Sequence, residues 1–315
     1  MVIGACYTGF GCGGFLMRDR TGHFVDSPSA GIEELKAGPT TARWLSSGEK
    51  MARIEVLSER VDHQFPHRLF EIMPDSHFWV RSRFEIFIQE AEKLGLDLTE
   101  RKVGLDIGCA HGIVQRQLAA RTRWSADGCD LTVAGLCENS GHTGRVLYYN
   151  IKERRPDFRE YYDFLIVFDV LEHIEGTNDF LQASLYHLKP GGYVFINVPA
   201  LQALHSRFDE VLGHIRRYDK ALLSEQLIDA GFGVLSLRYW GLTMIPLIYA
   251  RSVIVNSLTD ADKILEIGFK SPGRLTAAAL YGLLSLESWA LRSPSIGACL
   301  FAVARNDAAI DPNKR

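Results

Sequence analysis

The chain has 315 residues, of which 47% are hydrophobic and 23% are charged, and its formal net charge is −3. This length allows one large α/β domain with additions, or two small domains. No basic excess is present, which argues against a nucleic-acid partner, because phosphate binding needs clustered lysine and arginine. The six cysteines are scattered and do not suggest a disulfide framework, so we expect reduced thiols and a cytoplasmic protein.

The N-terminal part of the chain gives the weakest signals. Cys6 and Cys12 lie among five glycines, with only His23 nearby as a further ligand, which favours a glycine-rich leader over a zinc site. No charged segment precedes an apolar core, so no signal peptide is predicted. The segment Thr41–Gly95 has helical composition, interrupted at two prolines.

A strand that runs through a glycine turn into a helix is predicted over V-G-L-D-I-G-C-A-H-G-I, Val103–Ile113. Gly108 and Gly112 allow backbone N–H groups to approach a ligand closely. Asp106 precedes the first glycine by two positions and suits a cationic or hydroxylated ligand, whereas it would repel a pyrophosphate. Ala110 stands where the dinucleotide fingerprint G-x-G-x-x-G has its second glycine, which argues against a nicotinamide-dependent oxidoreductase.

Each of the next three predicted strands ends close to a polar side chain. The strands are Trp124–Leu131, Leu147–Ile151 and Tyr162–Leu171, and the polar residues are Asp130, Asn150 and Asp169. Ligands collect at the carboxyl ends of the strands in a doubly wound sheet, so we expect these side chains to share one crevice. A carboxylate such as Asp130 can accept hydrogen bonds from two vicinal ribose hydroxyls.

The remaining strands are predicted at Tyr193–Val198, Val234–Tyr239 and Ile296–Ala304, with a turn at L-K-P-G-G, Leu188–Gly192, before the first of them. Helices are expected over Val114–Ala120, Asn178–Tyr186 and Lys220–Ala230.

Three motifs resemble those of class I S-adenosylmethionine (SAM)-dependent methyltransferases. They are D-I-G-C-A-H-G at Asp106–Gly112, D-V-L-E-H-I at Asp169–Ile174 and L-K-P-G-G at Leu188–Gly192. The resemblance covers Val103–Val198 in the family's order. It implies a Rossmann-like α/β fold with a doubly wound seven-stranded sheet, in which the seventh strand is antiparallel between strands five and six. It also implies S-adenosyl-L-methionine as cofactor and S-adenosyl-L-homocysteine as product.

The family's cofactor contacts, carried over residue by residue, fall mainly on the strand ends. They are Asp106, Gly108, Cys109, Ala110, Gly112, Asp130, Leu131, Asn150, Ile151, Phe168, Asp169, Val170 and His173. The segment H-F-W followed by R-x-R resembles a helix that covers the SAM pocket in a bacterial subgroup, which adds Trp79 and Arg83; core packing is the alternative.

Two histidines are candidate general bases, His173 and His214, because an imidazole titrates near neutrality. His173 lies in D-V-L-E-H-I, where Asp169, Glu172 and His173 could instead bind a metal, as resembling residues do in ubiquinone-pathway O-methyltransferases, or simply pack beside SAM. An incomplete ligand set leads us to assign no metal.

The segment after the fifth strand, D-x-x-x-G-H-x-R-R-Y, resembles a bacterial methyltransferase subgroup found with cell-surface glycan and lipid-linked sugar pathways. Its polar residues are candidates for acceptor binding: Asp209, Arg216, Arg217 and Tyr218. The two arginines suit a carboxylate or phosphate clamp. Alternatively, ion pairs between Asp209 and the arginines only hold the loop.

Two apolar stretches precede the last strand, Trp240–Ala250 and Leu275–Leu286, within an insertion at residues 240–295. Each is too short to span a membrane. They suggest either two buried helices that form a cap or a dimer interface, or a platform for a lipid-linked acceptor at the inner face of the membrane. We divide the chain into a leader with pre-core helices, residues 1–95, and a methyltransferase core, residues 96–315.

These observations together predict O-methylation of a sugar, lipid-linked or small-metabolite hydroxyl. The cofactor's sulfonium activates the methyl group, so the protein chiefly has to align the acceptor in line with the methyl–sulfur bond. A catalytically silent SAM-binding scaffold is the main alternative, and the nicotinamide oxidoreductase is the weaker one. The expected partner is a small molecule or a lipid-linked glycan, and not nucleic acid.

Overall fold

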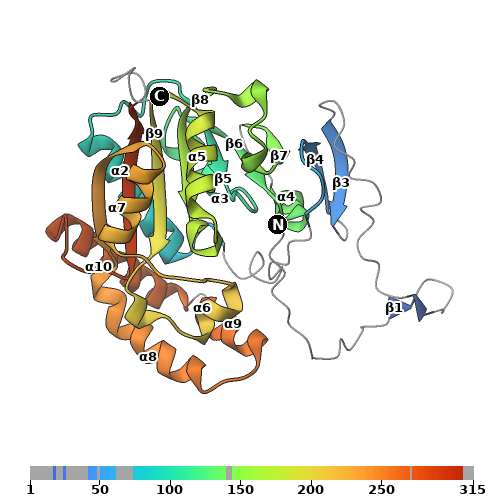
Figure 1. Ribbon diagram of the computed structural model, residues 1–315. Helices are drawn as coiled ribbons and strands as arrows, with labels where there is room; N and C mark the ends of the chain where they lie inside the picture. Colours follow the sequence, from blue (N-terminus) through green and yellow to red (C-terminus); the bar gives the residue numbers. More distant parts are fainter. Residues whose placement is uncertain are drawn as a thin grey trace.

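The computed structural model describes residues 17–18, 24–25, 42–47, 50–61, 74–139, 144–269 and 272–307. Nine strands form the main sheet, in the order β10-β11-β9-β8-β5-β6-β7-β4-β3 (Figure 1). Their bounds are β3 Ala42–Ser47, β4 Lys50–Val56, β5 Val103–Ile107, β6 Ser125–Asp130, β7 Val146–Tyr148, β8 Tyr162–Phe168, β9 Leu188–Pro199, β10 Phe232–Trp240 and β11 Cys299–Asn306. Met17–Arg18 (β1) and Phe24–Val25 (β2) pair separately.

The predicted doubly wound fold is confirmed. Strands β5 to β9 are parallel to one another, and the chain proceeds from β5 through β6 to β7 in one direction and through β8 to β9 in the other. β11 lies between β9 and β10 and is antiparallel to both, as expected for the seventh strand. The reversal of strand order falls between β5 and β8, and sheets of this kind bind their ligands in the crevice outside the carboxyl ends of the strands at such a point.

Helices cover both faces of the sheet (Figure 1). α5 (Thr177–His187) and α7 (Lys220–Asp229) pack on the face that presents Leu105, Leu165 and Ile196. α2 (Phe78–Lys93), α3 (Ile113–Arg121) and α10 (Arg274–Ala290) pack on the face that presents Phe164, Ile166 and Phe195. α4 (Val133–Glu138) packs beside β4 and β7. β8 is a continuous apolar run because both of its faces are covered in this way.

The short helices lie mostly near the strand ends. The 3₁₀ turns are η1 (Ile151–Glu153), η2 (Pro156–Phe158), η3 (Leu171–His173), η4 (Gln202–Leu204) and η5 (Leu242–Met244), and α6 spans Arg207–Leu212. α6 packs with α8 (Ile245–Asn256) and α9 (Ala261–Phe269) into a small apolar cluster at one end of the sheet (Figure 1).

The helix predicted across Thr41–Gly95 is present only as α2. Residues 42–47 and 50–56 instead form the antiparallel hairpin β3–β4, and β4 extends the sheet by pairing in parallel with β7. Arg-Ile-Glu-Val, at residues 53–56, alternates in polarity, a pattern that suits a half-buried strand. The prediction followed composition alone and was wrong for this part. The leader residues Cys6, Cys12 and His23 lie outside the described residues.

The predicted turn at Leu188–Gly192 lies within β9. The ladder pairs Tyr162 with Leu188 and then Phe164 with Tyr193, so the residues between bulge out of the β8–β9 pairing. Gly191 has a φ of +78°, which permits this irregular backbone.

The helices of the apolar insertion are only partly buried, through Val255, Ile264, Leu265 and Leu284, whereas one of the two predictions for it was two buried helices. Large apolar side chains are exposed on α8, α9, α10 and the segment that follows: Leu247, Tyr249, Val253, Ile254, Ile267, Leu275, Leu283, Leu286, Trp289, Leu291 and Ile296. Leu275 is 89% exposed and Trp289 is 74% exposed. Among the described residues, no helix combines the length and the apolar character needed to cross a bilayer.

Candidate functional site

The turn after β5 brings backbone groups to the crevice. Gly108 and Gly112 both have a φ of +77°, where an L-residue with a side chain is strained. A Cβ on Gly108 would lie 2.5 Å from Val170 Cγ2, and one on Gly112 would lie 2.2 Å from Asn139 Oδ1. Glycine is therefore required at both positions by conformation and by space.

Two carboxylates flank this turn. Asp106 is buried at the end of β5, and its Oδ2 has no hydrogen-bond partner among the described residues. Burial raises the pKa of Asp106 to about 7, with the Arg83 charge acting in the opposite direction and the Asp130 charge adding to the rise. Asp130, which is half-buried, accepts hydrogen bonds from Ala110 N at 2.9 Å and Thr132 N at 2.7 Å. Each oxygen of Asp130 retains a further lone pair for a ligand hydroxyl.

Asn150 follows β7 at the same edge, where it begins η1. Its side chain accepts a hydrogen bond from Lys152 N at 3.1 Å, and its backbone N–H donates to Ser58 Oγ at 2.8 Å. Its side-chain NH₂ and its second oxygen lone pair stay available to a purine edge, because an amide both donates and accepts. Ser58, just beyond β4, was not predicted at this edge, because the parallel pairing of β4 with β7 places it there.

A polar network joins α2 to the ends of three strands. Arg83 forms an ion pair with Asp169, whose Oδ1 accepts a hydrogen bond from Asn197 Nδ2 at 2.6 Å. Asn197 Oδ1 accepts in turn from Trp240 Nε1 at 2.9 Å. Trp79 stacks against Trp240 with ring centroids 4.6 Å apart. The helix predicted to cover the pocket is therefore fixed beside it.

Sequence reasoning missed Asn197. The only signal for it was a single amide in the otherwise apolar strand Y-V-F-I-N-V. Asp169 itself has a φ of +56°, in the left-handed region, and this costs about 1–3 kcal/mol for a residue other than glycine. The contacts of Arg83 and Asn197 with its carboxylate hold Asp169 in this position despite the cost.

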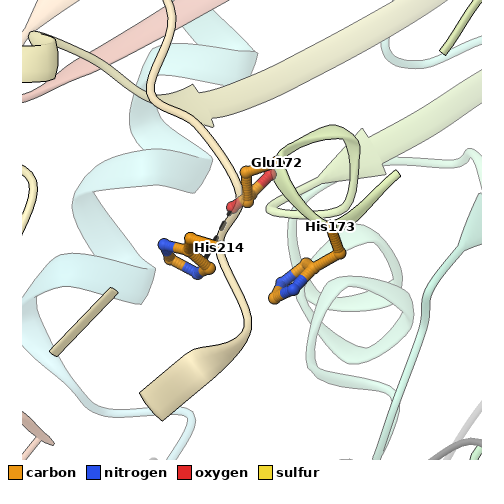
Figure 2. A group of neighbouring side chains, drawn as sticks. All are labelled: Glu172, His173 and His214. Atoms are coloured by element: carbon orange, nitrogen blue, oxygen red, sulfur yellow. Dashed lines mark ion pairs between the residues drawn. The ribbon is translucent and has the colours of Figure 1, made fainter. Parts of the chain in front are cut away.

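A second polar cluster follows β8, formed by Glu172, His173 and His214 (Figure 2). Glu172 and His173 lie in η3, and His214 comes from the loop after α6. The ring centroids of His173 and His214 lie 4.8 Å apart, and His214 Nε2 lies 3.9 Å from Glu172 Oε1. Burial, followed by the nearby Asp169 charge, raises the pKa of Glu172 well above its ordinary value.

His214 is held by a buried acid. Its Nδ1 lies 3.1 Å from Asp209 Oδ1, and the capping box of α6 fixes Asp209 through the Ser206 N–H and hydroxyl. Although burial alone would raise the pKa of Asp209, the hydrogen bond from His214 and the charge of Arg217 hold it at about 2. An ionised Asp209 can only accept, so His214 Nδ1 carries the proton and Nε2 carries the lone pair when the ring is neutral.

The structure corrects the expectation that Asp209, Arg217 and Tyr218 contact an acceptor. All three are buried. Arg217 binds both oxygens of Asp209 and the carbonyl of Ala200, and the Tyr218 hydroxyl donates to the carbonyl of Leu171 at 3.1 Å. The ion-pair network that holds the loop is thus the alternative that the geometry favours. Arg216 is half-buried and donates to Thr177 Oγ1 at 2.9 Å.

The structure also changes the set of candidate metal ligands, which from D-V-L-E-H-I were Asp169, Glu172 and His173. Asp169 is engaged by Arg83 and Asn197, whereas Glu172 and His173 meet His214 instead. The sequence could not place His214 there, because 41 residues separate it from His173.

Comparison with known proteins gives a consistent assignment. A family model described as a methyltransferase domain matches residues 79–237, half of the chain. A ubiquinone biosynthesis O-methyltransferase of Shewanella sp. is 34% identical over 101 residues, which are 30% of this chain and 42% of that protein. The Rickettsia conorii protein of the same name is 29% identical over 113 residues, which are 34% of this chain and 38% of that one. The matches span less than half the length of these relatives.

Solved structures show weaker likeness. Phosphoethanolamine N-methyltransferase 2 of Haemonchus contortus in complex with S-adenosyl-L-methionine is 17% identical, with a TM-score of 0.44. The superposition covers 70% of this chain and 52% of that one.

Proposed function

The chain belongs to the methyltransferase-domain family and is a SAM-dependent methyltransferase, and we propose that its acceptor is a hydroxyl group of a small or lipid-linked molecule. The observation that carries this proposal is the Asp209–His214 pair, whose imidazole lies against Glu172 in the 3₁₀ turn that follows β8. A histidine oriented by a carboxylate is a suitable general base for a hydroxyl, which needs to lose its proton as the methyl group arrives. The curated relatives that match this chain are named as O-methyltransferases, which supports oxygen as the acceptor atom.

The proposed cofactor position follows the crevice from β7 to β8. Asp130 receives the ribose hydroxyls, and Asn150 and Ile151 flank the adenine. The backbone of Gly108–Gly112 lies under the ligand. Asp106 faces the cationic methionine end, where its buried carboxyl would lose its proton to match the ligand charge.

The α2 side of the crevice completes this arrangement. Trp79 and Arg83 cover the ligand, and Arg83 is the cation nearest to Asp169. A guanidinium that already pairs with one carboxylate can also bind the carboxylate of the cofactor, because it has five N–H donors in a fixed fork.

In the proposed reaction, His214 Nε2 accepts the proton of the acceptor hydroxyl while the hydroxyl oxygen attacks the methyl carbon. The methyl–sulfur bond breaks and leaves S-adenosyl-L-homocysteine. Asp209 remains ionised and stabilises the imidazolium, and Arg217 keeps that carboxylate in place. Alignment of the oxygen with the methyl–sulfur bond supplies most of the acceleration, and the base contributes about 10²–10⁴-fold.

The exposed apolar side chains of α8 and α10 support an apolar or lipid-linked acceptor and contact with a membrane surface. A contiguous dimer interface on these helices is the alternative use of the same residues. A small soluble acceptor would need neither membrane contact nor a dimer interface.

The test is an acceptor screen that measures S-adenosyl-L-homocysteine formation with phenols, sugars and polyprenyl-linked analogues of each, compared with amine acceptors. We expect turnover with a hydroxyl acceptor, and a loss of kcat of about 10²–10⁴-fold in His214→Ala with unchanged S-adenosyl-L-homocysteine affinity. His205→Ala is the matched control, since His205 Nε2 bonds only the backbone carbonyl of His214 at 3.3 Å.

Transfer to amines alone would contradict the hydroxyl proposal. Cofactor binding without transfer to any acceptor would favour the scaffold alternative. Full activity of His214→Ala would remove its role as the base and leave His173 as the next candidate.

A further inference from the structure

Glu172 is a fully buried carboxyl group. Neither of its oxygens has a hydrogen-bond partner among the described residues, and its side chain is 0% exposed. His214 Nε2 lies 3.9 Å from Glu172 Oε1, which is beyond hydrogen-bond distance. An unsatisfied buried carboxyl is strongly unfavourable, so this position calls for a partner that the protein itself does not supply.

The hydrogen bonds of His173 and His214 determine which ring nitrogen of each imidazole carries the lone pair. His173 Nδ1 lies 3.2 Å from the Gly213 carbonyl, which can only accept, so Nδ1 donates. His214 Nδ1 donates to the ionised Asp209 carboxylate. In both neutral rings the lone pair is therefore on Nε2. Metal-binding histidines are characteristically oriented in this way, with the other ring nitrogen donating to a carboxylate or to a backbone carbonyl.

These observations lead to one ligand. We propose that Glu172, His173 and His214 bind a divalent transition-metal cation of the zinc class. One candidate ligand atom from each lies within 4.8 Å of the others, and the side chains converge in Figure 2. Two imidazole nitrogens and one carboxylate oxygen suit zinc and its neighbours, whereas magnesium and calcium prefer oxygen ligands only.

Binding requires a small closure of the cluster. Ligand bonds of about 2.0–2.1 Å in tetrahedral geometry place two ligand atoms roughly 3.4 Å apart. The half-buried His173 and His214 side chains must therefore rotate toward Glu172 when a cation binds.

The cation has a consequence for the reaction, and this part rests on the proposed function. A cation at His214 uses the Nε2 lone pair that would accept the acceptor's proton. Both roles cannot operate at once, so a bound zinc-class cation inhibits methyl transfer. It also links η3 to the loop after α6 and stabilises the fold through its binding free energy.

The experiment is zinc titration of the full chain after chelator treatment, by calorimetry and by metal analysis after gel filtration, with Co²⁺ absorption as a coordination signature. We expect one zinc per chain, no heat with Mg²⁺, and a visible Co²⁺ band typical of nitrogen and oxygen ligands. Glu172→Gln, His173→Ala and His214→Ala should each weaken zinc at least about 100-fold. Asp209→Asn, which only orients His214, should weaken it about 10–100-fold.

Two controls separate this site from others. His205→Ala should leave zinc affinity unchanged. Cys6→Ser/Cys12→Ser should also leave it unchanged, which excludes binding by the leader cysteines. S-adenosyl-L-homocysteine binding and a melting curve for each variant report independently on the cofactor site and on folding.

The proposal is overturned if wild type binds no zinc, or if Glu172→Gln and His173→Ala bind zinc as tightly as wild type does. Zinc binding with full activity would overturn the inhibitory role alone. A chain that binds zinc and S-adenosyl-L-homocysteine but methylates no hydroxyl would overturn the proposed function and leave the metal site standing.

Discussion

The cofactor side and the acceptor side of the crevice are built in different ways. On the cofactor side, each feature lies within a few residues of a strand end, as in Asp106 and Gly108 after β5 or Asp130 after β6. On the acceptor side, the loop after α6 folds onto itself through the Asp209–Arg217 ion pair and brings His214 to Glu172, which lies in the separate segment η3. Local chain geometry therefore sets the first side, while burial and ion pairing set the second. Mutations on the cofactor side and on the acceptor side should therefore have different effects.

The largest effect is expected from Arg217→Met, which acts on the acceptor side through stability. Removing the guanidinium leaves Asp209 buried without a cation, which costs about 3–5 kcal/mol of unfolding free energy. Urea denaturation followed by circular dichroism measures it. Arg154→Met is the control, because its exposed pair with Asp179 is worth about 1 kcal/mol or less. Equal losses in the two variants would refute a structural role for the Asp209–Arg217 pair.

The next effect is on the cofactor side alone. Asp130→Ala should weaken S-adenosyl-L-homocysteine about 10–100-fold, since it removes charge-assisted bonds to the ligand and the support of Ala110 N. Titration calorimetry measures this, with NAD as a ligand that should not bind. Asp157→Ala, at an exposed carboxylate outside the crevice, should not change the affinity. Unchanged affinity in Asp130→Ala would place the ribose elsewhere.

A pH dependence tests Asp106. Because burial raises its pKa to about 7, SAM affinity should rise about tenfold per pH unit from about pH 5 to 7 and then level off. In the ligand-free protein the folded state holds this proton more tightly than the unfolded chain. Stability should therefore fall as pH rises from about 4 to 7. Calorimetry and thermal melts across pH check both trends. Asp106→Asn should remove the affinity trend and reduce the stability trend, part of which remains because the pKa of Glu172 is also raised. A flat affinity profile in wild type would exclude Asp106 as the titrating contact.

The smallest effect concerns the apolar helices. Replacing both Leu275 and Trp289 with glutamate should lower binding to anionic lipid vesicles by about tenfold, because both side chains are largely exposed. Vesicle sedimentation measures the loss. Ile228→Glu on α7, where the side chain is 60% exposed, is the matched control away from this face. If only dimerisation changes, the face is a protein interface rather than a membrane contact.

Much of the fold and of the cofactor side could be predicted from the sequence. The apolar run of β8 and the glycine turn after β5 determined the fold class, because a doubly covered parallel strand and a positive-φ turn each leave a local pattern. The acids Asp106 and Asp130 followed from their positions relative to that turn. The hairpin β3–β4 was missed, since its two strands are stabilised by pairing with β7 rather than by their composition.

The tertiary structure alone decided the acceptor side. The motif G-H-x-R-R-Y gave no means to tell that Arg217 faces inward to Asp209 while His214 faces Glu172. It also decided that Asp169 is held by Arg83 and Asn197, which removes it from the metal set. The sequence by itself determined the strands from β5 onward, the turn and the cofactor class, because these depend on neighbours along the chain. Which polar groups are buried, and which of them meet, depends on contacts such as Arg83–Asp169 and His214–Glu172, which join separate segments and exist only after folding.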